Sequence, residues 1–186
     1  LRGSGLKGLV SFKKKRKKNN VNILRPLLDL KKKDLVFISK YIFNFYANDP
    51  SNSDDKFQRI RIRKLISNLE DEGLDKNKFL LTINNLKHSD ETIMFYVEKN
   101  LQKNCFFSEK KNEMILNNEF FSQPYEVVFR SLSNIITKIG KNYYSARGKK
   151  LDKVLSEISK KSFYKATLGG CIIQKVKQTV IITKEY

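Results

Sequence analysis

The stretch DPSNSDDKFQRIRIRKL, residues 49–65, joins a turn to the start of a basic helix. Its first part holds residues that end helices, form turns or cap the next helix. These residues are Asp49, Pro50, Ser51, Asn52 and Ser53. Apolar residues then recur at helical spacing, which predicts a helix from about Asp55 to Glu70. Its apolar face, the one expected to be buried, consists of Ile62, Leu65, Ile66 and Leu69.

The predicted helix carries an unusual load of cations. Lys56, Arg59 and Arg63 fall together along the flank of the apolar face, whereas Arg61 points elsewhere. Each cation near a helix N-terminus is unfavourable by ~0.3–1 kcal/mol. A bound anion would reverse that sign, because free N–H groups and arginine side chains both suit phosphate. Surface ion pairs are the alternative, and the candidate acids are Asp54, Asp55 and Glu70. The spacing alone leaves both interpretations open.

The overall charge points to a polyanionic partner. The chain of 186 residues has 38 lysines and arginines against 19 acids, a formal net charge of +19 and a pI near 9.9. Nucleic acid is the commonest polyanion for such a chain, and an acidic membrane surface is the alternative. With 40% hydrophobic residues the chain is not a disordered polar tail. No stretch approaches the ~18–20 apolar residues that span a bilayer, and no signal peptide opens the chain. A cytoplasmic location is therefore predicted.

Residue types that bind metals or form disulfides are sparse. Cys105 and Cys171 form no CxxC motif, so two buried or partly buried thiols are expected. His88 is the only histidine, which excludes a histidine-rich metal site and leaves no obvious acid–base partner. No metal ligands are predicted.

The beginning of the chain contains a possible phosphate-binding pattern. Gly3, Gly5 and Gly8 spell GxGxxG, and Asp29 lies at about the distance of a ribose-binding acid. Only two residues precede Gly3, so no strand can be seen to lead into the turn. The following run Lys13–Lys18 offers no apolar face to pack on a sheet. These points disfavour a dinucleotide site, and the lysine run is better explained as a solvated basic loop or a phosphate-facing patch.

The remaining segments predict a mainly α protein with a remnant of an α/β sheet. Residues 21–28 are expected to form a buried strand that is broken by Pro26 as it leaves its sheet, and residues 30–47 an amphipathic helix stopped by Pro50. A less regular segment, around residues 106–116, separates the later helices. The other predicted elements are helices over 75–103, from Pro124 onward and over 147–160, and a hairpin over about 170–184.

Three ordered blocks of sequence resemble the tRNA(Ile)-lysidine synthase family, which belongs to the PP-loop ATP pyrophosphatases. The blocks are RGSGLKGL, ILRPLL and NDPSNSDDKFQRIRIRKL. The matching residues are Arg2, Gly3, Gly5, Gly8 and Leu9, then Arg25, Pro26, Leu27 and Leu28, then Asp49, Ser51, Asn52, Arg59 and Arg63. Near the end, TLGGCIIQK and TVIITKE also resemble the C-terminal part of bacterial members. The resemblance is strongest over residues 1–65.

The chain departs from the family pattern at three points. Ile60 stands where the family has Asn, and the helix count places Ile60 off the apolar face, so a polar contact is expected to be missing. Asn48 replaces the Glu of the third block. The family's SGGxDS loop, which holds the ATP phosphates, does not occur in the sequence, and the chain does not begin with Met. The resemblance therefore implies an N-terminally truncated copy that carries the substrate-facing half.

The resemblance implies a fold and a division into domains. Residues 1–72 would be the C-terminal portion of a Rossmann-like PP-loop ATPase domain. Residues 73–165 would form a helical domain that faces or supports tRNA, and residues 166–186 a C-terminal β-hairpin.

The resemblance also implies a reaction. The full enzyme is a ligase that adenylates the wobble cytidine of an isoleucine tRNA with a CAU anticodon, after which the lysine amine displaces AMP. It uses ATP with Mg²⁺ and free lysine, whereas the 186-residue chain alone is expected to be inactive. A non-enzymatic, helix-rich RNA- or DNA-binding module is the alternative, which explains the charge but not the ordered blocks.

Candidate site residues follow from the same blocks. Arg2, Arg59 and Arg63 are expected to make polar contacts at the active site or to the tRNA backbone. Gly3, Gly5 and Gly8 would be turn positions or places of close backbone approach. The candidate tRNA-binding cations are Lys13, Lys14, Lys15, Arg16, Lys17, Lys18 and Lys56.

Overall fold

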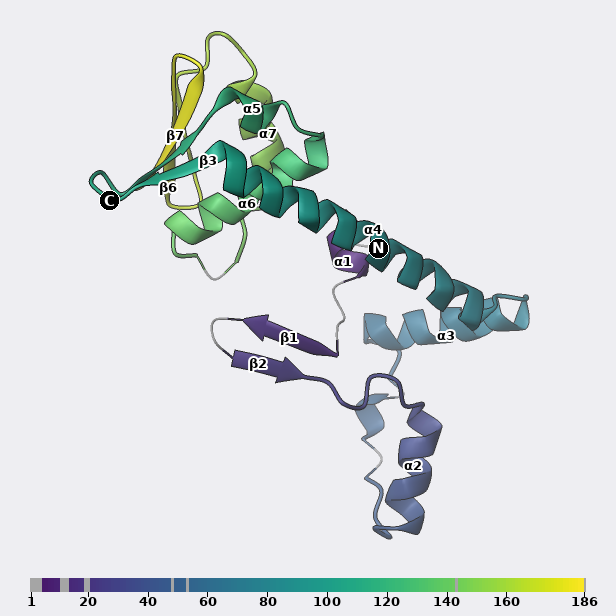
Figure 1. The fold of residues 1–186 in the computed structure, drawn as a ribbon. Coiled ribbons are helices and arrows are strands. Elements are labelled where there is room, and N and C mark those ends of the chain that lie inside the picture. Colours follow the sequence, from purple (N-terminus) through teal and green to yellow (C-terminus); the bar gives the residue numbers. More distant parts are fainter. Residues whose placement is uncertain are drawn as a thin grey trace. The chain divides into compact units, whose positions relative to one another are not determined.

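The computed structural model describes residues 5–10, 14–18, 21–47, 49–52, 54–142 and 144–185. Contacts between residues divide the chain into two compact units, Leu1–His88 and Ser89–Tyr186. This single boundary differs from the predicted divisions after residues 72 and 165. A long helix, α4 (Lys76–Asn104), is continuous across residue 88 and contributes to both units (Figure 1).

The first unit contains a β-hairpin and short helices. Its elements are α1 (Gly5–Leu9), β1 (Lys15–Lys18), β2 (Val21–Leu24), α2 (Lys32–Tyr41), the 3₁₀ turn η1 (Pro50–Asn52), α3 (Gln58–Asp71) and the start of α4. β1 and β2 pair antiparallel in a two-stranded sheet, with Lys15 opposite Leu24 and Lys18 opposite Val21. Lys15–Lys18 thus form a strand, so the interpretation of this part of the lysine run as a loop is wrong, and its interpretation as a phosphate-facing patch stays a prediction.

The strand predicted over residues 21–28 is shorter and more exposed than expected. β2 ends at Leu24, and Val21 and Leu24 are 61% and 64% exposed, so the prediction of a buried strand is wrong. The reason is that β2 pairs with β1 in a two-stranded ribbon, which has no packed face in which to bury β-branched or leucine side chains.

The helix predicted to stop at Pro50 ends earlier. α2 ends at Tyr41, and the backbone N–H of Ile42 still donates to the carbonyl of Ile38 at 2.9 Å. Asn44 then adopts a left-handed conformation with φ of 50°, which an α-helix cannot continue through. The N–H of Phe45 bonds the carbonyl of Ser39 at 3.2 Å and closes this turn. Local backbone geometry, rather than proline, therefore terminates the helix.

α3 confirms the predicted helix but not its predicted buried face. Ile60 is only 4% exposed, whereas Leu65 and Leu69 on the apolar stripe are 59% and 53% exposed. The expectation that Ile60 lies away from the buried side is therefore wrong. Burial depends on which side of a helix meets neighbouring chain, and the more apolar side of α3 is uncovered in the structure.

The second unit is built around a five-stranded antiparallel sheet. Its strands are β3 (Cys105–Ser108), β4 (Glu113–Leu116), β5 (Lys165–Leu168), β6 (Cys171–Val176) and β7 (Thr179–Lys184), in the order β3-β4-β7-β6-β5. The helices are α5 (Asn118–Phe121), α6 (Tyr125–Ile139) and α7 (Gly148–Ile158), together with the remainder of α4. The segment predicted as less regular thus supplies two of the strands, and β6 and β7 are two members of this larger sheet.

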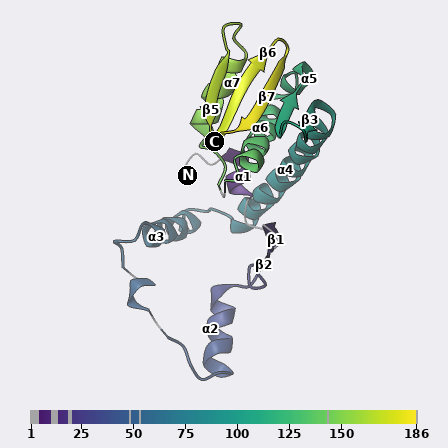
Figure 2. The same ribbon diagram turned by 90° about the vertical axis from the view of Figure 1, so that its left-hand side faces the viewer.

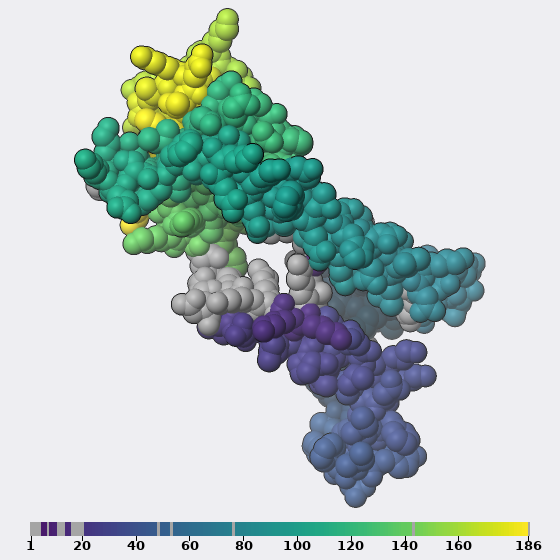
Figure 3. Space-filling view, in the orientation of Figure 1, coloured from purple at the N-terminus to yellow at the C-terminus, as the bar shows by residue number. Residues whose placement is uncertain are grey.

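The core of the second unit lies between the sheet and helices α6 and α7, which share one of its faces (Figure 2). Alternate residues of the strands point toward these helices and are fully buried, as for Ile173 in β6 and Ile182 in β7. Leu132 and Ile136 of α6 and Leu151 of α7 meet them. In the space-filling view, the residues of this unit form a closely packed mass that runs from teal to yellow (Figure 3).

A two-glycine turn connects β5 to β6. Leu168 pairs with Cys171, which leaves Gly169 and Gly170 as the two turn residues. Their φ angles of 60° and 67° are both left-handed, as tight hairpin turns of this kind require. The left-handed backbone of this turn therefore explains why both central residues of the LGGC segment are glycine.

Candidate nucleic-acid interface

The basic hairpin exposes lysines at its base. Lys14 and Lys15 are both exposed, and Lys14 forms an ion pair with Asp29. The N–H of Arg25 donates to the carbonyl of Lys14 at 2.7 Å, which extends the pairing of the two strands. Arg16, Lys17 and Lys18 lie in β1 and pair with Ile23, Asn22 and Val21 of β2. Lys13 lies outside the described residues. The hairpin thus concentrates cations along one short ribbon.

Only part of the first glycine block lies within the described residues. Arg2 and Gly3 lie outside the described residues. Gly5 begins α1 with φ of 59°, a left-handed conformation that favours glycine, although a Cβ would meet open space there. Gly8 lies inside α1. Gly5 therefore serves the entry into a helix through its φ angle rather than through a close approach of another group.

Arg59 and Arg63 are exposed one helical turn apart on α3. Two of the three acids proposed as their ion-pair partners bind other groups: Asp54 accepts the N–H of Lys56 at 2.9 Å, and Asp55 pairs with Lys64 at 2.6 Å. Arg59 instead lies over the Phe57 ring, with its Cζ 5.2 Å from the ring centroid. Among the described residues, no ion pair joins either arginine to Asp54 or Asp55.

Arg61 has a different role from its two neighbours. Its Nη1 donates to the carbonyls of Asp55 at 2.7 Å and Lys56 at 3.0 Å, so its guanidinium fastens the loop that enters α3. Lys56 itself is exposed. The prediction that Arg61 points away from the other arginines agrees with this arrangement, which separates one structural arginine from two arginines available to solvent.

The start of α3 has no side-chain cap. Phe57 occupies the N-cap position and its side chain makes no cap hydrogen bond, while Arg59 and Arg61 stand in the first turn, which contains no acid. The turn residues act earlier, because Asp49 accepts the N–H of Ser51 at 2.9 Å at the start of η1. Hydrogen bonds from Ser51 lower the pKa of the Asp49 carboxyl, and the nearby Arg59 charge lowers it further. The third sequence block therefore brings its acid and its first arginine into electrostatic reach. Asn48 lies outside the described residues.

The two cysteines lie in the second unit. Cys171 is buried and Cys105 partly buried, both as free thiols, which confirms the expectation for the cysteines. Burial raises the pKa of the Cys105 thiol to about 11. Within the described ranges no three His, Cys, Asp or Glu residues gather as a metal site would require. None of the described helices is long and apolar enough to cross a membrane.

The sequence interpretation missed a buried charge cluster in the second unit. Arg130 of α6 is 4% exposed; its Nη1 lies 2.5 Å from Asp90 Oδ1 and its Nε 2.7 Å from Glu126 Oε1. Burial opposes the charged form, but the bonds to Asp90 and Glu126 outweigh burial and raise the pKa of Arg130. The spacing of Glu126 and Arg130 could have been detected as an i,i+4 pair. Asp90, forty positions from Arg130, could not.

Comparison with known proteins identifies the relatives of this chain. Residues 1–70 match the sequence model of a PP-loop domain. A tRNA(Ile)-lysidine synthase of Wolbachia pipientis wMel is 28% identical over 185 residues, which cover 99% of this chain and 43% of that enzyme. The tRNA(Ile)-lysidine synthase of Orientia tsutsugamushi (strain Boryong) is 30% identical over 207 residues, covering 100% of this chain and 44% of that enzyme. The chain is similar to tRNA(Ile)-lysidine synthases along almost its whole length.

These matches cover both units of this chain but only part of each relative. The chain spans less than half the length of the relatives named here, and one from Anaplasma marginale (strain St. Maries), 28% identical, is covered over 38% of its length. The match to a PP-loop domain agrees with the family that the three sequence blocks indicated. The described residues of this chain add helices and a five-stranded antiparallel sheet to that assignment.

Proposed function

We propose that this chain forms the substrate-facing part of a tRNA(Ile)-lysidine synthase. In the proposed reaction ATP activates the wobble cytidine of an isoleucine tRNA with a CAU anticodon, and the amine of free lysine then displaces AMP. The observation that carries the proposal is the similarity to tRNA(Ile)-lysidine synthases along 99% of the chain. The net charge of +19 supports an RNA partner, because phosphate contacts supply much of the affinity for RNA.

The proposed RNA-binding surface consists of the β1–β2 hairpin and the start of α3. Arg59 and Arg63 are the best candidates for phosphate contacts, since both are exposed and the acids just before α3 bind other groups. An arginine can bind a phosphate through two parallel hydrogen bonds. A phosphate at the start of α3 would also offset the unfavourable placement of cations near a helix N-terminus. ATP and Mg²⁺ belong to the proposed reaction, and the residues that would hold them are not identified in this chain.

The first prediction tests the two arginines. We expect Arg59→Ala and Arg63→Ala each to weaken binding of tRNA(Ile) to the 186-residue chain by about 1.5–3 kcal/mol, as for loss of a charged hydrogen bond. The slope of log affinity against log salt should become shallower by about 0.7–0.9 for each lost contact. The unfolding free energy should change by less than about 0.5 kcal/mol, because both side chains are exposed. Filter binding at several salt concentrations and thermal unfolding measure these quantities.

Arg61→Ala is the matched control, since it removes the same charge from the same helix. Arg61 fastens the loop before α3, so its loss should lower the melting temperature as well as tRNA affinity. If Arg59→Ala and Arg63→Ala lower the melting temperature as Arg61→Ala does while tRNA affinity holds, the two arginines are structural and this surface is wrongly assigned.

The second prediction concerns catalysis. The chain contains no SGGxDS sequence, so the 186-residue protein alone should not exchange pyrophosphate with ATP or form lysidine. A chimera that joins an SGGxDS-containing PP-loop segment of a tRNA(Ile)-lysidine synthase to the start of this chain should form lysidine. The assay is incorporation of labelled lysine into tRNA(Ile). Adenylation of tRNA by the unextended chain would contradict the prediction, and a well-folded but inactive chimera would argue for a binding module without catalytic function.

A further inference from the structure

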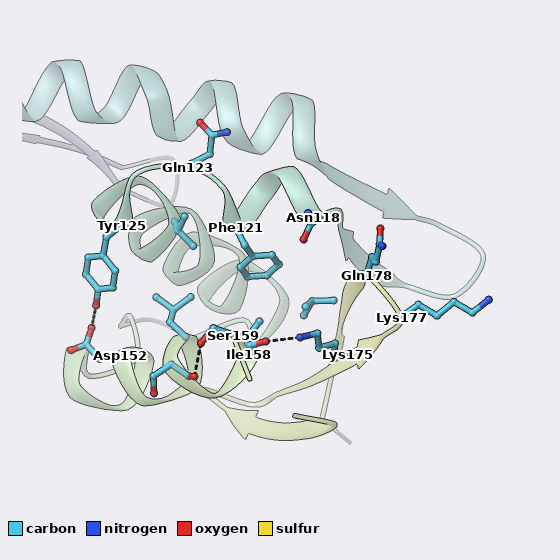
Figure 4. A pocket seen from close by; sticks show the side chains of 14 residues that line it. Asn118, Phe121, Gln123, Tyr125, Asp152, Ile158, Ser159, Lys175, Lys177 and Gln178 are labelled. Carbon is cyan, nitrogen blue, oxygen red and sulfur yellow. Dashed lines mark hydrogen bonds between the residues drawn. The ribbon is translucent and has the colours of Figure 1, made fainter. Parts of the chain in front are cut away.

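Two neighbouring pockets lie in the second unit, on either side of Gln123. The larger, of about 800 Å³, opens among α5, α6, α7 and the turn between β6 and β7 (Figure 4). The smaller, of about 220 Å³, lies against α4 and also includes Gln123 in its lining. Gln123 is half-buried, and its side chain amide donates to the carbonyl of Glu119 at 3.2 Å, which holds it between the two pockets.

The larger pocket has an apolar interior and a polar rim. Its apolar lining residues are Phe121, Val128, Leu155, Ile158 and Val180, and the Phe121 ring points into the centre (Figure 4). Amide groups of Asn118, Gln123 and Gln178 stand around it, and Lys177 extends outward from the rim. A volume of this size is typical of sites for small organic ligands, in which few polar groups fix the orientation of the ligand.

Several rim groups of this pocket are already held in place. The Tyr125 hydroxyl bonds Asp152, which raises the pKa of Tyr125 to about 12 and satisfies the only carboxylate in the lining. Lys175 Nζ donates to the carbonyl of Ile158 at 2.8 Å and to that of Lys160 at 3.3 Å. The rim therefore offers an aromatic ring, neutral amides and the exposed Lys177, and its one carboxylate, that of Asp152, accepts the Tyr125 hydroxyl.

The smaller pocket is polar and cationic. Lys99 and Lys103, both exposed, stand one turn apart on α4, and Tyr96 lies beside them. The pocket floor is rigid, because buried Asn100 donates to the Phe120 carbonyl and to Ser131 Oγ, both at 3.3 Å, and accepts from Asn104 at 2.9 Å. No carboxylate is among its lining residues, all of which are described. Two lysines at this spacing, without an acid, suit a phosphate group.

We propose that the two pockets together bind one nucleotide of an unpaired RNA segment, with its base in the larger pocket and its phosphate at Lys99 and Lys103. Nucleobases stack on aromatic and apolar side chains and are read by amide groups along their edges. The inference rests on the proposed function for its RNA partner. An apolar peptide would fit the larger pocket but would leave the cationic pocket without a complementary charge.

The test uses the 186-residue chain and a single-stranded RNA hexamer with a central 2-aminopurine, whose fluorescence reports stacking. Ser156 is exposed on the pocket rim, and Ser156→Trp should fill the pocket without entering the core. We expect about five- to 150-fold weaker hexamer binding by this variant, the loss that corresponds to one stacked base. The matched control is Thr167→Trp, at an exposed position on β5 outside both pockets, which should bind as the wild-type chain does.

A second pair of variants tests the phosphate position. Lys99→Glu and Lys103→Glu should each weaken hexamer binding more than Lys110→Glu, which reverses an exposed charge in the same unit outside both pockets. AMP, adenosine and inorganic phosphate are added as competitors. Displacement of the hexamer by AMP would identify a free nucleotide as a second source of the same ligand, and a lack of displacement would restrict the site to an RNA strand; both agree with the proposal.

Several results would overturn the inference. One is equal hexamer binding by Ser156→Trp and Thr167→Trp. Another is an equal loss of hexamer binding for Lys99→Glu and Lys110→Glu. The third is that Ser156→Trp prevents binding of an apolar peptide but not of the hexamer. Circular dichroism checks that the variants are folded. If the arginines of α3 affect tRNA binding while the pocket variants bind RNA normally, only this inference fails. If the chain binds the hexamer through the pockets but does not bind tRNA(Ile), only the proposed function fails.

Discussion

Gly140→Ala should destabilise the second unit by at least about 3 kcal/mol, at the upper end of the cost of overpacking a well-packed core. Gly140 follows α6 with an ordinary helical φ of −69°, so alanine meets no backbone strain there. Space is the obstacle, because a Cβ would lie 2.1 Å from the carbonyl oxygen of Gly169 and 2.9 Å from that of Ile136. Both neighbours are backbone atoms that cannot rotate away. Urea unfolding followed by circular dichroism measures the loss.

The contacts around Gly140 explain why the backbone cannot simply yield. Asn142 donates its side chain amide to the Gly169 carbonyl, and the N–H of Glu185 donates to the Gly170 carbonyl at 2.9 Å. The β5–β6 turn is therefore tied to the end of α6 and to the end of β7. Any shift that accommodates a methyl group would disturb these bonds.

Gly148→Ala is the matched control for this prediction. A Cβ at Gly148, the first residue of α7, would lie 3.8 Å from Phe129 Cζ, which is ordinary contact. Alanine favours helix over glycine by about 0.5–1 kcal/mol, so this variant should be neutral or slightly stabilised. If Gly140→Ala and Gly148→Ala unfold at the same urea concentration, the close packing of α6 against the β5–β6 turn is wrong.

Asp90→Leu should cost about 3–5 kcal/mol of unfolding free energy, because it leaves the buried Arg130 guanidinium without its α4 partner. The two groups join α4 to α6 at 2.5 Å, and the Arg130 side chain is 5% exposed. Its Nη2 is already buried without a hydrogen-bond partner among the described residues, so a second unsatisfied nitrogen would add to an existing cost. Urea unfolding of the single variant measures the loss.

The double variant Asp90→Leu with Arg130→Met separates the loss of the α4 charge partner of Arg130, which keeps Glu126 in the single variant, from lost packing. Replacing both members of a buried ion pair by apolar groups is often nearly neutral, so the double variant should recover most of the stability that Asp90→Leu loses. A double variant at least as unstable as Asp90→Leu would mean that shape at this position, rather than charge, holds α4 on α6.

The helices show what the apolar spacing of the sequence could predict and what it could not. α6 has the predicted start after Pro124, and its apolar residues at helical spacing, such as Leu132 and Ile136, are fully buried. α3 has equally regular spacing, yet its apolar stripe is exposed and Ile60 is buried. The difference is that a period identifies a helix and its more apolar side, whereas burial requires a second element that covers that side.

The candidate surface likewise has features that the sequence predicted and features that only the fold explains. The order of the three blocks indicated the PP-loop family, and the spacing of Arg59 and Arg63 placed them one turn apart, because both depend on local chain geometry. Arg61 stabilises the loop before α3 through hydrogen bonds to two carbonyls, and only the folded loop brings these carbonyls within reach of its side chain. Nothing in the residue types distinguishes Arg61 from Arg59.

The sequence by itself determined the charge, the resemblance to tRNA(Ile)-lysidine synthases and the positions of the long helices, since these depend on composition, on residue order and on periods within one segment. The tertiary structure alone decided that residues 105–116 form strands, because β4 pairs with β7, more than sixty residues later. It also decided that Asp90 meets Arg130 and that Gly140 lies against Gly169. Such pairings form between segments far apart in the chain, whose meeting depends on the packing of all the elements between them.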